Sequence, residues 1–200
     1  MIVYLHDFNA SPSEKLIEEL KEIDSLVLSP FMDYYNPEKS FAELDKIIKD
    51  NIDYNPVLTG FGLGGYFAFN IAGKYRLKSA LFNPILKPWN VLRRYQGEKI
   101  TNNKIGKNFK VSNSFTEELE NLNYFDKKQR DTIVFLDIKN ESGIDPFETY
   151  EEVKDFCDCY IIDDSSKESS WIQAKPFLKN FMLEERIFLE DSYDDDLWYN

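Results

Sequence analysis

A glycine-rich turn between an apolar strand and a helix is the segment that most directly suggests chemistry. Residues 57–59 read V-L-T, and residues 60–65 read G-F-G-L-G-G. Glycines at the first and fifth positions of such a turn are typical of the G-x-S-x-G nucleophile elbow, whose tight backbone presents a serine to an acyl group. The middle residue here is Gly62, which carries no side-chain nucleophile. A phosphate-binding loop is excluded, because no Lys-Ser or Lys-Thr pair follows the glycines.

Two further segments carry specific motifs in the right order and spacing. Residues 4–12 read Y-L-H-D-F-N-A-S-P, and residues 78–84 read K-S-A-L-F-N-P. With residues 60–66, these segments resemble the Y-L-H-G-F-N-S-S-P opening, the G-x-S-L-G-G-Y elbow and the K-A-V-L-I-N-P strand of the small bacterial esterases of the YqiA/YcfP-like family. The resemblance covers nearly the whole chain. It implies an α/β-hydrolase fold and a Ser-His-Asp catalytic triad.

Each triad position implied by the resemblance holds another residue. Gly62 stands at the serine position, and Asn140 stands where the acid is expected. The histidine position falls on Ser166 or Lys167, depending on the gap. The only histidine of the chain is His6, which matches the oxyanion-loop motif and is expected to anchor that loop. The alternative for His6 is a base in altered chemistry.

The oxyanion-binding donors implied by the resemblance are main-chain N–H groups. They are expected from Leu63, which follows the elbow position, and from the loop at Asp7 and Phe8. Asp7 replaces the glycine of the family motif. A carboxylate there is expected to repel a developing oxyanion, so this departure also argues against esterase activity.

Several acidic and polar residues are expected at the carboxyl edge of the sheet. Asp7, Asn140 and Glu141, with Asp163 and Asp164, would form an acidic pocket able to bind a divalent cation or an amine. The favoured alternative is that abandoned catalytic positions have drifted to polar residues. No metal site and no cofactor is expected.

The two cysteines, Cys157 and Cys159, are unsuited to a mutual disulfide. One residue separates them on an expected strand, which places their Cβ atoms about 6.6 Å apart, farther than the roughly 3.5–4.5 Å of a disulfide. We expect one thiol in the core and one nearer the surface. A substitute nucleophile is disfavoured, because no histidine lies nearby in the sequence.

The pattern of elements predicts an α/β fold of the compact α/β-hydrolase type, with a mostly parallel sheet flanked by helices and a small irregular cap insertion. Short apolar strands alternate with helical stretches. The first helix is expected to be capped by Ser11, with Pro12 at its first position and Glu14 three residues after the cap. An acidic amphipathic helix is expected between the last two strands. The expected strands are 2–5, 25–28, 57–59, 79–82, 133–137 and 160–162, and the other expected helices are about 40–50, 66–75 and within 171–183.

The expected domain organisation is one hydrolase-like domain over residues 1–189. Its polar, Asn- and Lys-rich insertion at about 87–129 is expected to cover the carboxyl edge of the sheet, where ligands bind in this architecture. Residues 190–200 form an acidic tail that ends in aromatic residues.

The acidic composition argues against two classes of partner, nucleic acids and membranes. The chain has 36 acidic and 24 basic residues, for a net charge of −12. Such a surface repels nucleic-acid phosphates and anionic membranes, so neither is expected as a partner. No leader and no apolar run of about 18 residues is visible, which predicts a cytoplasmic protein.

The sequence therefore predicts a non-catalytic, esterase-like protein that binds an unidentified protein or small molecule in a scaffolding or regulatory role. The alternatives are a hydrolase with metal- or carboxylate-assisted chemistry and a residual esterase acting on small acyl esters.

Overall fold

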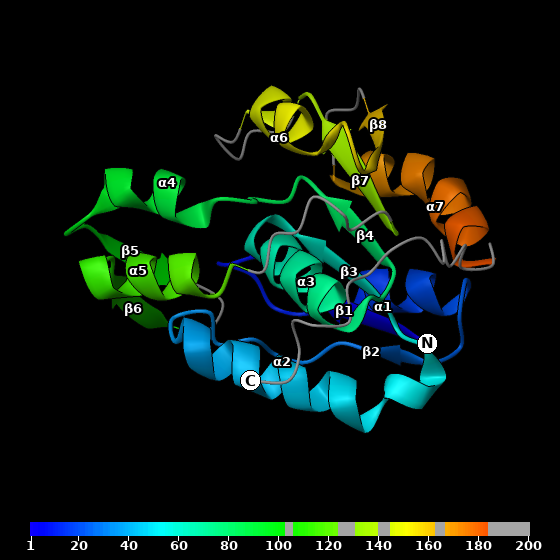
Figure 1. Cartoon of the computed structure of the whole chain (residues 1–200), viewed down its shortest axis with the longest axis horizontal. Helices are drawn as coiled ribbons and strands as arrows, with labels where there is room; N and C mark the ends of the chain where they lie inside the picture. Colours follow the sequence, from blue (N-terminus) through cyan, green and yellow to red (C-terminus); the bar gives the residue numbers. More distant parts are fainter. Residues whose placement is uncertain (103–105, 124–130, 140–144, 163–166, 184–200) are drawn as a thin grey trace, which may run out of the picture.

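A six-stranded parallel sheet forms the centre of the computed structural model, which describes residues 1–102, 106–123, 131–139, 145–162 and 167–183, with the backbone alone for 167–170. The strand order is β2-β1-β3-β4-β7-β8. Helices cover both faces of this sheet (Figure 1). The sheet strands are β1 (Ile2–Leu5), β2 (Val27–Leu28), β3 (Val57–Phe61), β4 (Ser79–Phe82), β7 (Thr132–Asp137) and β8 (Asp158–Ile162).

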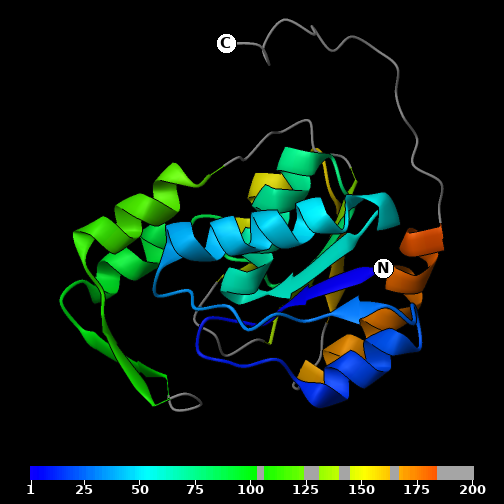
Figure 2. The ribbon, with the colours of Figure 1, turned by 90° about the horizontal axis from the view of Figure 1, so that it is seen from below.

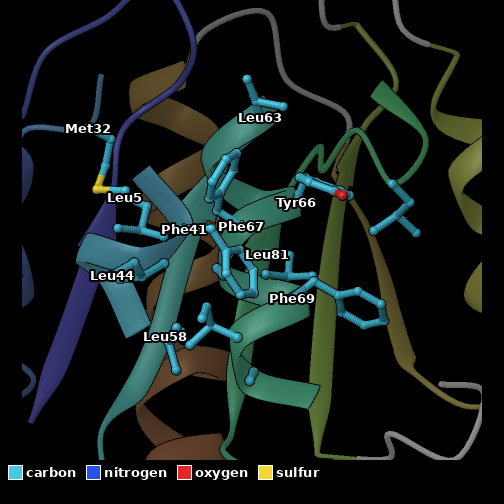
Figure 3. Close-up of a cluster of buried hydrophobic side chains, with 14 of the residues drawn as sticks. Leu5, Met32, Phe41, Leu44, Leu58, Leu63, Tyr66, Phe67, Phe69 and Leu81 are labelled. Atoms are coloured by element: carbon cyan, nitrogen blue, oxygen red, sulfur yellow. The ribbon is translucent and has the colours of Figure 1, made fainter. Parts of the chain in front are cut away.

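Alternation along the strands divides the core into two layers, because successive side chains point to opposite faces. Val3 and Leu5 pack with α2 (Pro37–Asp50) and α3 (Gly62–Tyr75). Ile2 and Tyr4 pack on the other face, where α1 (Glu14–Lys21) and α7 (Lys167–Leu183) lie. Figure 3 shows aromatic side chains of α3 in the first layer beside Leu5, Leu58 and Leu81. The predicted fold class is confirmed.

The first helix begins two residues later than expected. Ser13, not Ser11, is its N-cap, and the Ser13 hydroxyl accepts a hydrogen bond from the Leu16 N–H at 3.3 Å. Ser13 has extended backbone angles, so the helical turn starts only at Glu14 and Pro12 lies outside it. Pro12 and Glu14 favoured Ser11 in the sequence, but Ser13 is an equally good capping residue type, and the structure uses it.

The insertion is more regular than expected. Its described part holds α4 (Pro88–Leu92), a short 3₁₀ turn (η2, Arg93–Tyr95), the antiparallel strands β5 (Lys99–Asn102) and β6 (Lys107–Lys110), and α5 (Asn113–Asn121). The hairpin extends from the body in Figure 2. Phe109 on β6 packs against Phe8 and Tyr35, with ring centroids 6.2 and 4.8 Å apart. These tertiary contacts stabilise a hairpin that the polar local sequence did not indicate.

The remaining elements are a 3₁₀ turn (η1, Ile52–Tyr54) and α6 (Pro146–Val153), which is the acidic helix predicted between the last two strands. Among the described residues, no helix combines the length and apolar character needed to cross a bilayer.

Candidate functional site: the elbow at Gly62

The elbow is a direct passage from strand β3 into helix α3. Gly62 is the first residue of α3, and its φ of +52° lies in the left-handed region that favours glycine. A side chain at this position would face Asp7, because an ideal Cβ built on Gly62 lies 2.1 Å from the Asp7 Oδ1 atom. The space beside Gly62 is therefore filled by the Asp7 carboxylate and is not the open ligand pocket that a missing side chain would suggest.

The backbone of the elbow is held closely on two sides. A Cβ on Gly64 would lie 2.3 Å from the main-chain oxygen of His6, so only glycine permits this approach between α3 and the loop after β1. The Gly62 carbonyl accepts a hydrogen bond from the Ile85 N–H at 3.1 Å. The turn thus keeps the shape of a nucleophile elbow without a nucleophilic side chain.

The two N–H groups expected to bind an oxyanion both donate to Asp7. The Phe8 N–H and the Leu63 N–H reach the same oxygen, Oδ1, at 2.7 and 3.1 Å. The sequence predicted that a carboxylate at Asp7 would repel an oxyanion; in the structure this carboxylate accepts hydrogen bonds from both of the predicted donors.

The negative charge of Asp7 affects two tyrosines in the core. Burial, and secondly the Asp7 charge, raise the pKa of Tyr4 to about 12. The same two causes raise the pKa of Tyr34 well above its usual value. Neither phenol is therefore available as a base near neutral pH.

Both ring nitrogens of His6 are hydrogen-bonded to main-chain groups. His6 is 1% exposed, and Nε2 accepts a hydrogen bond from the Met32 N–H at 3.0 Å. Nδ1 must then carry the proton, which it donates to the Asp7 carbonyl at 2.8 Å. Burial lowers the pKa of His6, although the Asp7 carbonyl and carboxylate oppose this shift. These two hydrogen bonds require a neutral imidazole, which holds the loop after β1 in place.

The neutral state of His6 predicts a pH-dependent stability. Because the pKa is lower in the folded state, the unfolded chain takes up a proton first as the pH falls below about 6.5. The free energy of unfolding is therefore expected to decrease from pH 7 to pH 5, by at most about 1.4 kcal/mol per pH unit. Urea unfolding across this range measures it. His6→Gln retains an acceptor for Met32 and does not titrate, so an equal slope in this variant would contradict the assignment.

Two polar residues that the sequence analysis did not single out lie at the same edge of the sheet. Asn83, directly after β4, has a φ of +42°, and its Oδ1 accepts a hydrogen bond from the Asp137 N–H at 2.8 Å. Asp137 ends β7, is 6% exposed, and accepts a hydrogen bond from the Lys139 N–H at 2.9 Å. In the sequence, the signals that could have identified these residues were the Asn-Pro pair after the strand 79–82 and the acidic residue at the end of the strand 133–137.

Several predicted site residues lie outside the description. Asn140, Glu141, Asp163, Asp164 and Ser166 are not among the described residues, and Lys167 is described only as the start of α7. Among the residues that the structure does describe, no three His, Cys, Asp or Glu side chains gather as metal ligands. The acidic pocket at this edge stays a prediction.

A surface groove of about 780 Å³ lies elsewhere, between α4, η2 and α6. No elbow residue lines it. Its lining residues are Asn90, Arg94, Asp145, Phe147, Glu148, Glu151 and Glu152.

The cysteines agree with the expectation of one buried and one less buried thiol. Cys157 is buried, Cys159 is partly buried, and both are free. Burial, and secondly Asp158, raise the pKa of the Cys159 thiol to about 11, and burial also raises the pKa of Cys157. Strand β8, which carries Cys159, is three positions from β3 in the sheet. Neither thiol is poised as a nucleophile.

The parallel sheet, its two helical layers and the elbow define a protein of the α/β-hydrolase fold. Solved structures agree: an esterase domain from Rhodothermus marinus covers 90% of this chain and 85% of its own, at a TM-score of 0.62 and 18% identity. One of the metagenome-derived lipolytic enzymes LipS and LipT covers 90% and 93%, at a TM-score of 0.65 and 12% identity. These likenesses show the fold alone.

The chain belongs to UPF0227, described as an uncharacterised protein family, whose pattern matches residues 1–176. It is similar to the UPF0227 protein YcfP of Escherichia coli O9:H4 (strain HS), 25% identical over 185 residues, 90% of this chain and 95% of the relative. A UPF0227 protein of Citrobacter koseri is 26% identical over 162 residues, 78% and 83% of the two chains. The predicted YcfP-like resemblance is confirmed.

Proposed function

We propose that this chain is a non-catalytic member of its family, retained for a binding, scaffolding or regulatory role. The observation that carries the proposal is the state of its single imidazole. His6 is the only histidine of the chain, and both of its ring nitrogens are hydrogen-bonded to main-chain groups. A base at the elbow would need a free ring nitrogen facing position 62.

The elbow supports the same proposal. Gly62 offers no hydroxyl, and the groups of a catalytic triad act as a unit, so the loss of one already removes most of the rate. The residual catalysis of a disabled triad, roughly a thousandfold over water, comes from substrate binding and the oxyanion hole. Both N–H donors of this hole are engaged by Asp7. An elbow that keeps its close backbone packing but has no nucleophile and no free oxyanion-binding N–H donors supports a role in binding.

The test is hydrolysis of short- and medium-chain p-nitrophenyl esters, together with labelling by a fluorophosphonate that reacts with activated serines. We expect no rate above buffer and no mass increase, beside an active esterase as a positive control. Gly62→Ala is an unsuitable comparison, because its Cβ would collide with Asp7. Asp7→Asn retains the shape and removes the charge. Hydrolysis that co-purifies with the protein and is lost in Asp7→Asn would overturn the proposal.

A further inference from the structure

Helix α3 begins without a cap of its own. Its N-cap residue is Phe61, whose side chain makes no capping hydrogen bond. The first N–H groups of a helix have no partner within the helix and carry its positive dipole end. The Leu63 N–H, in the first turn, donates instead to Asp7, which lies 56 residues earlier in the chain. Asp7 therefore supplies to α3 both the acceptor and the negative charge of an N-cap.

The carboxylate also fits the space of an absent side chain. Both of its oxygens lie within 2.8 Å of an ideal Cβ at Gly62. One of them, Oδ1, additionally accepts the Phe8 N–H. The carboxylate thus takes the place of an elbow side chain and of the anion that two convergent N–H groups would otherwise bind.

The loop that carries Asp7 is held by a chain of hydrogen bonds. The Asp7 carbonyl accepts from the His6 ring and, at 3.1 Å, from the Ala10 N–H. The Tyr34 hydroxyl donates to the His6 carbonyl at 2.7 Å, and the Met32 N–H donates to the His6 ring. These contacts position the Asp7 main chain, and the Phe8 and Leu63 N–H groups position its carboxylate against the elbow.

We propose that Asp7 is the permanent internal anion of the elbow: it converts the oxyanion-binding donors into a cap for α3 and closes this position to external carboxylate, phosphate or oxyanion groups. The inference deepens the proposed function, since it names the residue that closes the site. It also assigns a structural use to the glycine at position 62, which leaves room for the carboxylate.

The test compares Asp7→Asn and Asp7→Gly with wild type by urea unfolding and amide NMR. Asn keeps an acceptor and loses the charge, so we expect the unfolding equilibrium constant to rise about threefold. Gly loses both, and about a tenfold rise is expected, with faster hydrogen exchange at the Leu63 and Phe8 amides. Inorganic phosphate should shift these two amide resonances saturably in Asp7→Gly and leave them unchanged in wild type.

Asp50→Asn is the matched control, because Asp50 is exposed at the last position of α2 and its loss should not destabilise the protein. The proposal is overturned if Asp7→Asn and Asp7→Gly unfold like this control, or if phosphate shifts the wild-type amides. If Asp7→Gly does not fold, the Asp7→Asn constant decides alone, with an unchanged value counting against the proposal. An ester hydrolysis rate would contradict the proposed function and leave these results untouched.

Discussion

Substituting Gly62 with serine, the residue that the elbow pattern would place there, is expected to lower the free energy of unfolding by about 3 kcal/mol and to restore no esterase activity. A left-handed backbone costs a residue with a side chain roughly 1–2 kcal/mol. The rest comes from Asp7, whose Oδ1 lies 2.1 Å from the new Cβ and must leave its two N–H partners. Urea unfolding measures the loss, and p-nitrophenyl acetate measures activity.

Two comparisons isolate the contact with Asp7. Gly106→Ser places the same side chain at a φ of +67°, where a Cβ meets no atom within 4 Å beyond its own chain neighbours. This variant therefore reports the backbone cost alone, about 1 kcal/mol. In an Asp7→Gly background, Gly62→Ser should likewise cost only about 1 kcal/mol, because the collision is gone. Additive effects of the two substitutions would show that Asp7 and position 62 do not compete for one space.

The second large effect is expected at Phe82, where alanine should cost about 3–5 kcal/mol. Phe82 is 3% exposed and stacks between Phe61 and Phe135, with ring centroids 4.5 and 4.8 Å away. The Trp171 ring of α7 packs on it at 5.6 Å. Removing the ring would leave a cavity between three strands and a helix, which the surrounding backbone cannot close.

Phe177→Ala provides the control for Phe82→Ala. Phe177 packs on Tyr160 at the edge strand β8 and is 45% exposed, so its loss should cost about 1 kcal/mol or less. Thermal or urea unfolding of both variants measures the difference. Equal effects would mean that Phe82 does not lie at the centre of the aromatic side chains that line this face of β3, β4, β7 and β8.

The proposed closure of the elbow relates stability to function. Groups that stabilise a transition state are usually left unsatisfied in the resting protein, and this costs stability. Here the Leu63 and Phe8 N–H groups are satisfied by Asp7 in the resting structure. If the chain is non-catalytic, as proposed above, these N–H groups are free to stabilise the fold. The unfolding experiments on the Asp7 and Gly62 variants measure how much stability these satisfied N–H groups contribute.

The sequence by itself determined the sheet, the position of the elbow and the residue types at its centre. Apolar strands alternating with amphipathic helices leave few packings other than a covered parallel sheet. Gly60 and Gly64 were readable because only glycine allows the close backbone contacts seen there. Helix ends were less certain, as at Ser11 and Ser13, because neighbouring residues offered equivalent caps.

The tertiary structure alone decided which contacts the elbow and the insertion make. Nothing local indicates that Asp7 accepts the Leu63 N–H, because the contact depends on how β1 and β3 pair and on where the next loop turns. The hairpin of the insertion likewise depends on Phe109 packing against Phe8, far earlier in the chain. Periodicity and propensity report interactions within a few residues, whereas the closure of the elbow is a contact between distant segments whose geometry is set only when the sheet assembles.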